Sequence, residues 1–143
     1  MPTQRKAEVV WEGNLTEGSG TIVSNTSGAL PQLPVSWPSR SEEPNGKTSP
    51  EELIAAAHAA CYAMALSHGL AEAGYTAERL DTSATVTFEP GEGIRSSELT
   101  VRGRVPGLSE EEFRKHAEDA KTGCPVSQAL TGVEITLHAQ FAG

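Results

Sequence analysis

The sequence predicts an α+β fold in a single domain spanning residues 1–143. Short strand-like segments come first, one long alanine-rich helical segment follows, and an alternating pair of segments joined by a tight turn comes next. Two further helical segments and a last strand complete the chain. Strands and helices occur in runs and do not form a strand–helix–strand series, which is why α+β is favoured.

The N-terminal third predicts three short strands, at residues 7–11, 18–24 and 33–37. The third of these contains Pro34, which cannot donate to a strand ladder, so we expect it at a sheet edge. Residues 38–49 are polar and lack periodicity, which predicts a loop, and this loop carries Arg40.

A long helix is predicted to begin at residue 50. Ser49 is a good N-cap, Pro50 suits the first helical position, and Glu52 lies three residues after Ser49, as a capping box requires. Residues 53–66 are apolar nearly all round, which is typical of a helix buried in a core. Gly74 is the expected glycine after its C-terminus.

The remaining elements follow from turn and capping residues. Segments 79–89 and 94–105 predict an antiparallel hairpin around a turn at 90–93. Ser109 and Glu112 repeat the capping box and predict a helix to about residue 121. A short helix over 126–130 and a strand over 133–137 are expected after it.

Charge and composition exclude some classes of binding partner. Eleven basic and nineteen acidic residues give a net charge of -8, and the resulting negative field repels nucleic acid. We find no apolar run near the roughly 20 residues of a membrane span and no apolar segment after the basic N-terminus, so we expect a cytoplasmic protein without a membrane partner. Two cysteines and four scattered histidines give poor support for a metal site.

The two cysteines have different settings. Cys61 lies mid-helix, where a free thiol is most often inert packing and where apolar burial raises its pKa. Cys124 directly precedes Pro125, so we expect it to cap a new helix whose N–H groups lower its pKa, although an ordinary helix break fits equally well. On physical grounds alone Cys124 is the better nucleophile. Their separation excludes a CxxC pair and leaves their distance open.

Two motifs around these cysteines carry a family resemblance. The segment SPEELIAAAHAAC at residues 49–61, together with GCPVS at residues 123–127, resembles the OsmC/Ohr family of osmotically inducible and organic-hydroperoxide-resistance proteins. The resemblance extends from Trp11 to the closing strand. It implies an intertwined homodimer in which antiparallel sheets pack around a long buried central helix carrying Cys61, with two active sites at the subunit interface.

The resemblance also implies an activity and its residues. Cys61 matches the peroxidatic cysteine of a thiol-dependent peroxidase, Cys124 the resolving cysteine, and Glu51 the family's glutamate. Arg40 matches the arginine of the OsmC branch, because residues 13–24 lack the arginine of the Ohr branch. Organic hydroperoxides, and hydrogen peroxide with them, are the implied substrates. A Cys61 sulfenic acid, a Cys61–Cys124 disulfide and an external dithiol such as a dihydrolipoyl group on a protein are implied, with no bound cofactor.

Helical spacing adds a hypothesis about this site. Glu51 and Cys61 are ten residues apart, or about 15 Å along one straight helix. This distance is too long for the two side chains of one chain to contact the same substrate oxygen. We therefore expect Arg40 and Glu51 to serve Cys61 of the other subunit.

Other interpretations stay open. His58, one turn before Cys61, either tunes that thiol or is a core histidine satisfied by a carbonyl group. A cysteine-nucleophile hydrolase would use Cys61 with His58 as its base. A stress-induced module that binds an apolar ligand would need neither residue for catalysis.

Overall fold

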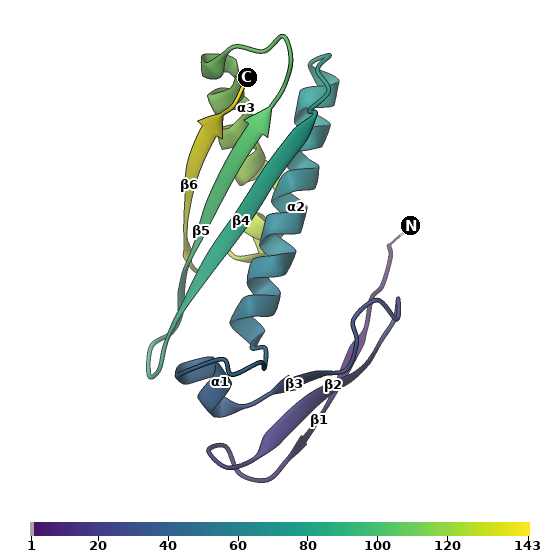
Figure 1. Ribbon diagram of the computed structural model, residues 1–143, viewed down its shortest axis with the longest axis vertical. Helices are drawn as coiled ribbons and strands as arrows, with labels where there is room; N and C mark the ends of the chain where they lie inside the picture. Colours follow the sequence, from purple (N-terminus) through teal and green to yellow (C-terminus); the bar gives the residue numbers. More distant parts are fainter. Residues whose placement is uncertain (1) are drawn as a thin grey trace. The chain divides into compact units, whose positions relative to one another are not determined.

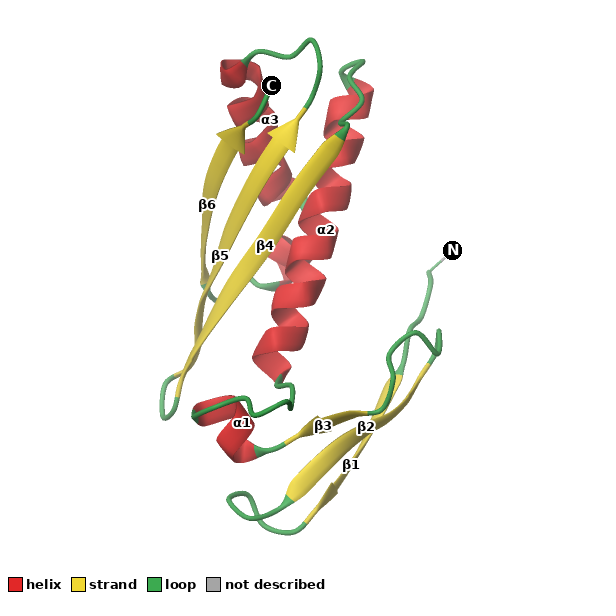
Figure 2. Cartoon of the chain, in the orientation of Figure 1, coloured by secondary structure: helices red, strands yellow, loops and turns green. Residues whose placement is uncertain are grey.

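The computed structural model describes residues 2–143, and these divide into two compact units, residues 2–53 and 54–143. The elements are drawn in Figure 1 along the sequence and in Figure 2 by type. Each unit is described by itself, and the assignment of both to one domain stays a prediction.

The first unit holds a three-stranded antiparallel sheet in the order β1-β2-β3. Its strands are Ala7–Glu12, Ser19–Asn25 and Leu33–Val35, which confirms the three predicted strands. Every residue of β1 is exposed, and Ile22 is the one buried hydrophobic side chain among the described residues of this unit. The unit therefore has almost no core of its own.

A short helix, α1 (Trp37–Ser41), lies where the sequence predicted the end of a strand and the start of a loop. The prediction was wrong for Trp37 and for part of the 38–49 loop. The Ser36 hydroxyl accepts a hydrogen bond from the Ser39 backbone N–H at 3.1 Å, and the Ser39 hydroxyl accepts one from the Ser36 N–H at 3.1 Å. This capping box, with Pro38 in the first turn, makes one helical turn stable without any apolar periodicity.

Helix α2 (Pro50–Glu72) begins and ends where predicted. The Ser49 hydroxyl accepts a hydrogen bond from the Glu52 N–H at 3.1 Å, as an N-cap does. The Glu52 carboxylate accepts from the Thr48 hydroxyl at 2.5 Å, so it is held at the helix start by a side chain. Gly74 has φ +93, a conformation that glycine adopts without strain.

The second unit contains a three-stranded sheet in the order β4-β5-β6. Strands β4 (Arg79–Glu89) and β5 (Gly93–Arg104) form the predicted antiparallel hairpin. Strand β6 (Glu134–Phe141) pairs with β5 in parallel, which corrects the expectation of purely antiparallel sheets. The reason is the connection: α3 (Glu110–Gly123) and α4 (Pro125–Ala129) carry the chain back before β6 starts.

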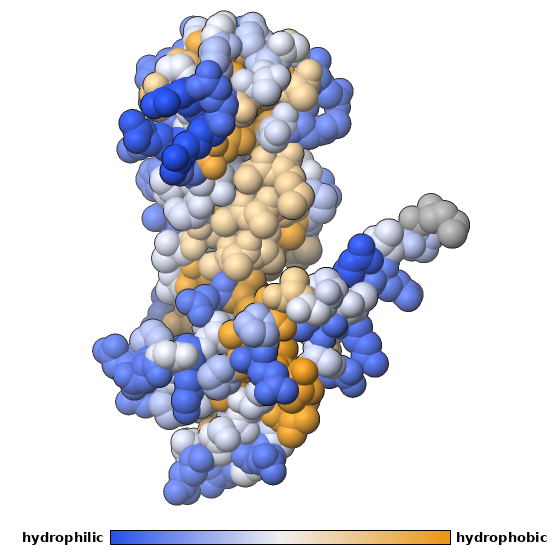
Figure 3. All heavy atoms as spheres, turned by 45° about the vertical axis from the view of Figure 1, so that its right-hand side comes forward, coloured by the Kyte–Doolittle hydropathy of each residue, from blue (hydrophilic) through white to orange (hydrophobic). Residues whose placement is uncertain are grey.

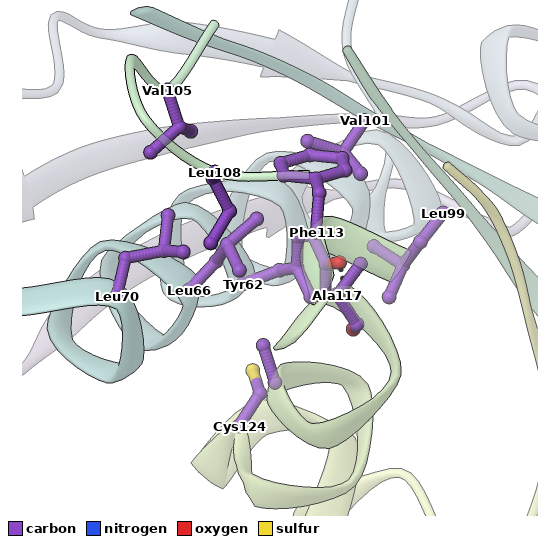
Figure 4. Packing of buried hydrophobic residues seen from close by; sticks show 11 residues of the cluster. Tyr62, Leu66, Leu70, Leu99, Val101, Val105, Leu108, Phe113, Ala117 and Cys124 are labelled. Atoms are coloured by element: carbon purple, nitrogen blue, oxygen red, sulfur yellow. Dashed lines mark hydrogen bonds between the residues drawn. The ribbon is translucent and has the colours of Figure 1, made fainter. Parts of the chain in front are cut away.

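The core of this unit lies between α2, α3 and the sheet. Tyr62, Leu66 and Leu70 project from α2 at helical spacing and meet side chains of α3 and β5, as Figure 4 shows. The Tyr62 hydroxyl donates to the Ala117 carbonyl at 2.9 Å. A Cβ at Gly103 would lie 2.4 Å from the Phe113 ring, so this strand position requires glycine. The packing fixes α2 and α3 against one sheet face.

The opposite face of α2 is exposed in the single chain. It consists of small and apolar side chains at a spacing of three to four residues: Ala56, Ala60, Met64, Ser67 and Ala71. Met64 is 71% exposed, and Figure 3 shows a continuous pale-orange surface over this part of the unit. Within the second unit the helix is therefore not buried all round, as had been expected, because the sheet covers a single face of α2.

Helix α2 is also long and apolar enough to cross a membrane by length and composition, which corrects the expectation that no such stretch exists. Core helices of globular proteins pass the same test. Its buried face packs on the sheet through His58, Tyr62, Leu66 and Leu70.

Candidate functional site

Arg40 and Glu51 form a bidentate ion pair within the first unit. Arg40 Nε donates to both carboxylate oxygens of Glu51 at 3.0 Å, and Arg40 Nη2 donates to Oε2 at 2.8 Å. Glu51 is buried at the first turn of α2, and the Arg40 side chain, from α1, is 31% exposed. The fork geometry fixes the guanidinium plane while leaving part of the group accessible.

Cys61 and Cys124 come together in the second unit, although 63 positions separate them in the sequence. Cys61 is half-buried on α2, and Cys124 is fully buried at the N-cap of α4, as predicted from Pro125. Each cysteine shifts the pKa of the other, so the two side chains are neighbours. Neither cysteine is in a disulfide.

The surroundings shift the pKa values of the two thiols in opposite directions. Burial raises the pKa of Cys61, and the neighbouring Cys124 raises it further. Burial also acts to raise the pKa of Cys124. Hydrogen bonds from Cys61, from the N–H groups of Ser127 and Val126 and from the Ser127 hydroxyl outweigh it, so the Cys124 pKa lies below its ordinary value. Within residues 54–143, Cys124 is the more acidic thiol.

His58 is fully buried one turn before Cys61, and both of its ring nitrogens bond serine hydroxyls. Nδ1 lies 2.7 Å from Ser97 Oγ of β5, and Nε2 lies 2.8 Å from Ser127 Oγ of α4. The expectation that a carbonyl group satisfies this histidine is therefore wrong. His58 bonds Ser127 and not the thiol of Cys61.

Sequence reasoning missed Ser97 and Ser127 as members of this site. Both are buried serines with no distinctive local pattern. Ser127 alone gave a signal, since it lies three residues after Cys124 at the start of a predicted helix, where side chains at that spacing are neighbours. Ser97 comes from a distant strand, and only the fold brings it to His58.

The buried histidine predicts an acid sensitivity of the fold. Burial lowers the pKa of His58 from its ordinary value of 6.5, so below pH 6.5 the unfolded chain takes up a proton that the folded chain refuses. The free energy of unfolding is expected to fall with decreasing pH by up to about 1.4 kcal/mol per pH unit in this range. Urea unfolding at several pH values and a fixed protein concentration measures it.

The control variants separate His58 from the other histidines. His58→Gln should flatten this slope, while His68→Gln, at a side chain that is 75% exposed, should leave it unchanged. Equal slopes for wild type and His58→Gln would contradict the assignment.

A metal centre finds no support in the part of the chain that the structure describes. No group of three or more His, Cys, Asp or Glu side chains there could hold an ion. Three histidines lie outside the cysteine site, and two of them pair with single glutamates, His68 with Glu72 and His138 with Glu98.

Comparison with known proteins places this arrangement in a family. The family model described as OsmC-like protein matches residues 43–138. The chain belongs to the OsmC family. It is 45% identical over 99% of both chains to a protein named peroxiredoxin OsmC from Escherichia coli strain K12, and equally to one of the same name from Shigella flexneri.

Solved OsmC-family structures share the fold. An OsmC-like protein from Mycoplasma pneumoniae matches with a TM-score of 0.74 at 18% identity over the full length of both chains. An organic hydroperoxide resistance protein from Elizabethkingia anophelis matches with a TM-score of 0.70 at 25% identity, covering 99% of this chain and 100% of that one. The organic hydroperoxide resistance protein OhrB of Bacillus subtilis gives 0.68 at 25% identity, over 94% and 98%.

Proposed function

We propose that this OsmC-family chain is a cysteine-based peroxidase that reduces organic hydroperoxides, and hydrogen peroxide with them, through Cys61 and Cys124. The observation that carries the proposal is the proximity of these two thiols, each of which shifts the pKa of the other, in a chain that is 45% identical to proteins named peroxiredoxin OsmC. A peroxidase of this class needs a thiolate and a second thiol that can reach it, and the neighbouring positions of the two cysteines support the second requirement.

The proposed reaction has two chemical steps. The Cys61 thiolate attacks the terminal oxygen of the hydroperoxide, the O–O bond breaks, and a proton yields the alcohol beside a Cys61 sulfenic acid. The Cys124 thiolate then attacks the Cys61 sulfur, the S–O bond breaks, and hydroxide takes up a proton to leave as water. The resulting disulfide protects Cys61 from further oxidation.

The first step requires a cation near Cys61, because its own surroundings raise the pKa of this thiol. Arg40 is the proposed cation. Its ion pair with Glu51 fixes the guanidinium plane, and the side chain is 31% exposed, so the positive charge is accessible from solvent. We propose that the pair acts on Cys61 of a partner subunit, since ten helical residues separate Glu51 from Cys61 in one chain.

Exposed apolar surface supports the proposed homodimer. In the first unit, Val9, Val10 and Trp11 of β1 are 57, 51 and 40% exposed, and Ile22 alone is buried among its described hydrophobic residues. The uncovered face of α2 adds Met64. A three-stranded sheet with so small a core needs a partner surface for independent stability. A second copy of the chain is the proposed partner.

The cycle closes when an external dithiol reduces the disulfide. We propose a dihydrolipoyl group on a protein as this reductant, because two linked thiols remove a disulfide through a mixed-disulfide intermediate and then cyclise. The proposal requires no bound cofactor.

A stopped-flow assay tests the function. Reduced protein is mixed with cumene hydroperoxide or hydrogen peroxide in the presence of dihydrolipoamide, and peroxide consumption is followed. We expect turnover with both substrates, faster with cumene hydroperoxide, and a Cys61–Cys124 disulfide in the mass spectrum of protein sampled before the dithiol is added. Absence of both turnover and disulfide would refute the proposal.

The hydrolase alternative loses its base in this structure. Both ring nitrogens of His58 bond serine hydroxyls, of Ser97 and Ser127, so neither nitrogen is placed to take a proton from Cys61.

A further inference from the structure

Three arginines and one aspartate gather at one end of the sheet β4-β5-β6, where β4 begins and β5 ends (Figure 1). Arg79 and Asp81 lie two positions apart on β4, and Arg102 and Arg104 lie two positions apart on β5. The antiparallel register places Arg79 opposite Arg104 and Asp81 opposite Arg102. All four residues are exposed, so these charges meet at the surface of the second unit.

The face of the sheet that carries these charges is the one turned away from the helices. Leu80 and Val101 pack in the core on the other face, together with the Phe113 ring of α3. Successive side chains of a strand point to opposite faces, so the charged residues beside Leu80 and Val101 point outward. There they line an open hollow of about 270 Å³. We call this the arginine hollow, and its lining residues are Arg79, Asp81, Arg102, Gly103, Arg104 and Ala142.

The single aspartate of the arginine hollow balances one of its three arginines. Arg79 Nε donates to the two carboxylate oxygens of Asp81 at 3.0 and 3.1 Å, and Arg79 Nη2 lies 2.9 Å from Oδ1. Among residues 2–143, no carboxylate lies within ion-pair distance of Arg102 or Arg104. The hollow therefore has an excess of two positive charges, although the chain as a whole has a net charge of -8. A positive site of this kind attracts anions.

The pairing of Arg79 with Arg104 also points to an anion. Like charges directly opposite each other in an antiparallel pair destabilise a sheet. The neighbouring outward positions of the sheet hold the neutral side chains of Ser83, Thr100 and Gln140, which do not offset this repulsion. An anion that lies between the two guanidinium groups relieves it. The repulsion is thus a cost in stability that a ligand of opposite charge turns into binding energy.

We propose that the arginine hollow is a binding site for a phosphate dianion, either inorganic phosphate or the phosphate group of a small phosphomonoester. A guanidinium group donates parallel N–H bonds to two phosphate oxygens, and the charge of a dianion matches the two excess positive charges. The volume lies just below the range of about 300–1,000 Å³ that is typical of drug-sized ligands, so a small anion fits. The site lies on the sheet face opposite α2, which carries Cys61, and is independent of the proposed peroxidase function.

Isothermal titration calorimetry of the full chain tests the proposal. The protein is titrated with inorganic phosphate or with glucose 6-phosphate at about pH 8, where a phosphate group is a dianion, and chloride keeps the ionic strength constant. We expect saturable binding of both probes. Tighter binding of glucose 6-phosphate would identify a phosphomonoester as the source of the phosphate, and tighter binding of inorganic phosphate would identify the free ion.

Two variants of the arginine hollow have opposite effects on the protein without phosphate. Arg104→Gln should weaken phosphate binding by about tenfold or more, because a charged hydrogen bond is lost. It should also raise the melting temperature in phosphate-free buffer, because the repulsion with Arg79 is gone. Arg102→Gln should weaken binding to a similar degree without this gain, since Arg102 lies opposite Asp81. Circular dichroism checks that both variants fold.

The matched control is Arg95→Gln, the same change of charge on the same strand but outside the arginine hollow. It should leave the phosphate affinity unchanged. This control is needed because phosphate also stabilises proteins by its exclusion from their surface. The proposal is overturned if wild type shows no saturable binding, if Arg104→Gln and Arg102→Gln bind as tightly as wild type, or if Arg95→Gln weakens binding equally. Peroxide consumption is measured separately, so neither failure affects the other.

Discussion

Cys61→Ser is expected to abolish peroxide reduction, with a loss of at least about three orders of magnitude, the scale seen when a nucleophile is removed. The protein then has no accessible thiolate to attack the peroxide, although Cys124 has the lower pKa of the two thiols in the wild-type chain. Cys124 is fully buried, and Cys61 is only half-buried, so access and not acidity decides which sulfur meets the substrate. Stopped-flow peroxide consumption measures this.

Cys124→Ser is the matched variant for this prediction. It should still consume one equivalent of peroxide per chain and then accumulate sulfenic acid, which excess peroxide converts to sulfinic acid. Mass spectrometry reads out both species. The opposite pattern, with loss in Cys124→Ser and survival in Cys61→Ser, would reverse the assigned roles.

Arg40→Ala should reduce the rate of peroxide attack by about 10- to 150-fold, the factor for losing a charged hydrogen bond of roughly 1.5–3 kcal/mol. Removing the guanidinium also takes away the hydrogen bonds that Arg40 donates to the buried Glu51 carboxylate, so the folded state loses stability. Arg40→Lys is the control, since it keeps the charge but not the fork geometry and should give an intermediate rate. Circular dichroism checks that each variant folds.

Mixed subunits decide whether the site is composite. An Arg40→Ala chain mixed with a Cys61→Ser chain should regain about a quarter of the wild-type activity, because half of the dimers formed at random are mixed and each has one complete site. If Arg40 serves Cys61 of its own chain, the mixture should show no more activity than its two components.

The elements with strong local signals could be predicted from the sequence. The N-cap at Ser49, the capping box at Ser109, the glycine at position 74 and the hairpin turn each depend on neighbouring residues, and each lies where expected. The reciprocal half of the capping box predicted at Ser49 does not form, because the Glu52 carboxylate bonds Thr48. The parallel pairing of β6 could not be predicted, because the sequence of a strand does not state its partner's direction. Helix α1 was missed because its stability comes from two serines and a proline, without apolar periodicity.

The candidate site divides in the same way. The helical settings of Cys61 and Cys124 could be inferred from local sequence, whereas their contact depends on how α4 packs beside α2. The interpretation of His58 failed because its partners, Ser97 and Ser127, are 39 and 69 positions away. Buried polar networks assembled from distant elements leave little trace in any one segment.

The parallel pairing of β5 and β6 has a consequence for motion. The segment that carries Cys124, α3 and α4, connects β5 to β6. Because these two strands are paired, both ends of the segment are held by the sheet. Such a segment cannot swing outward unless β6 first frays from the sheet. The backbone position of Cys124 beside α2 is therefore expected to persist for as long as β6 stays paired with β5.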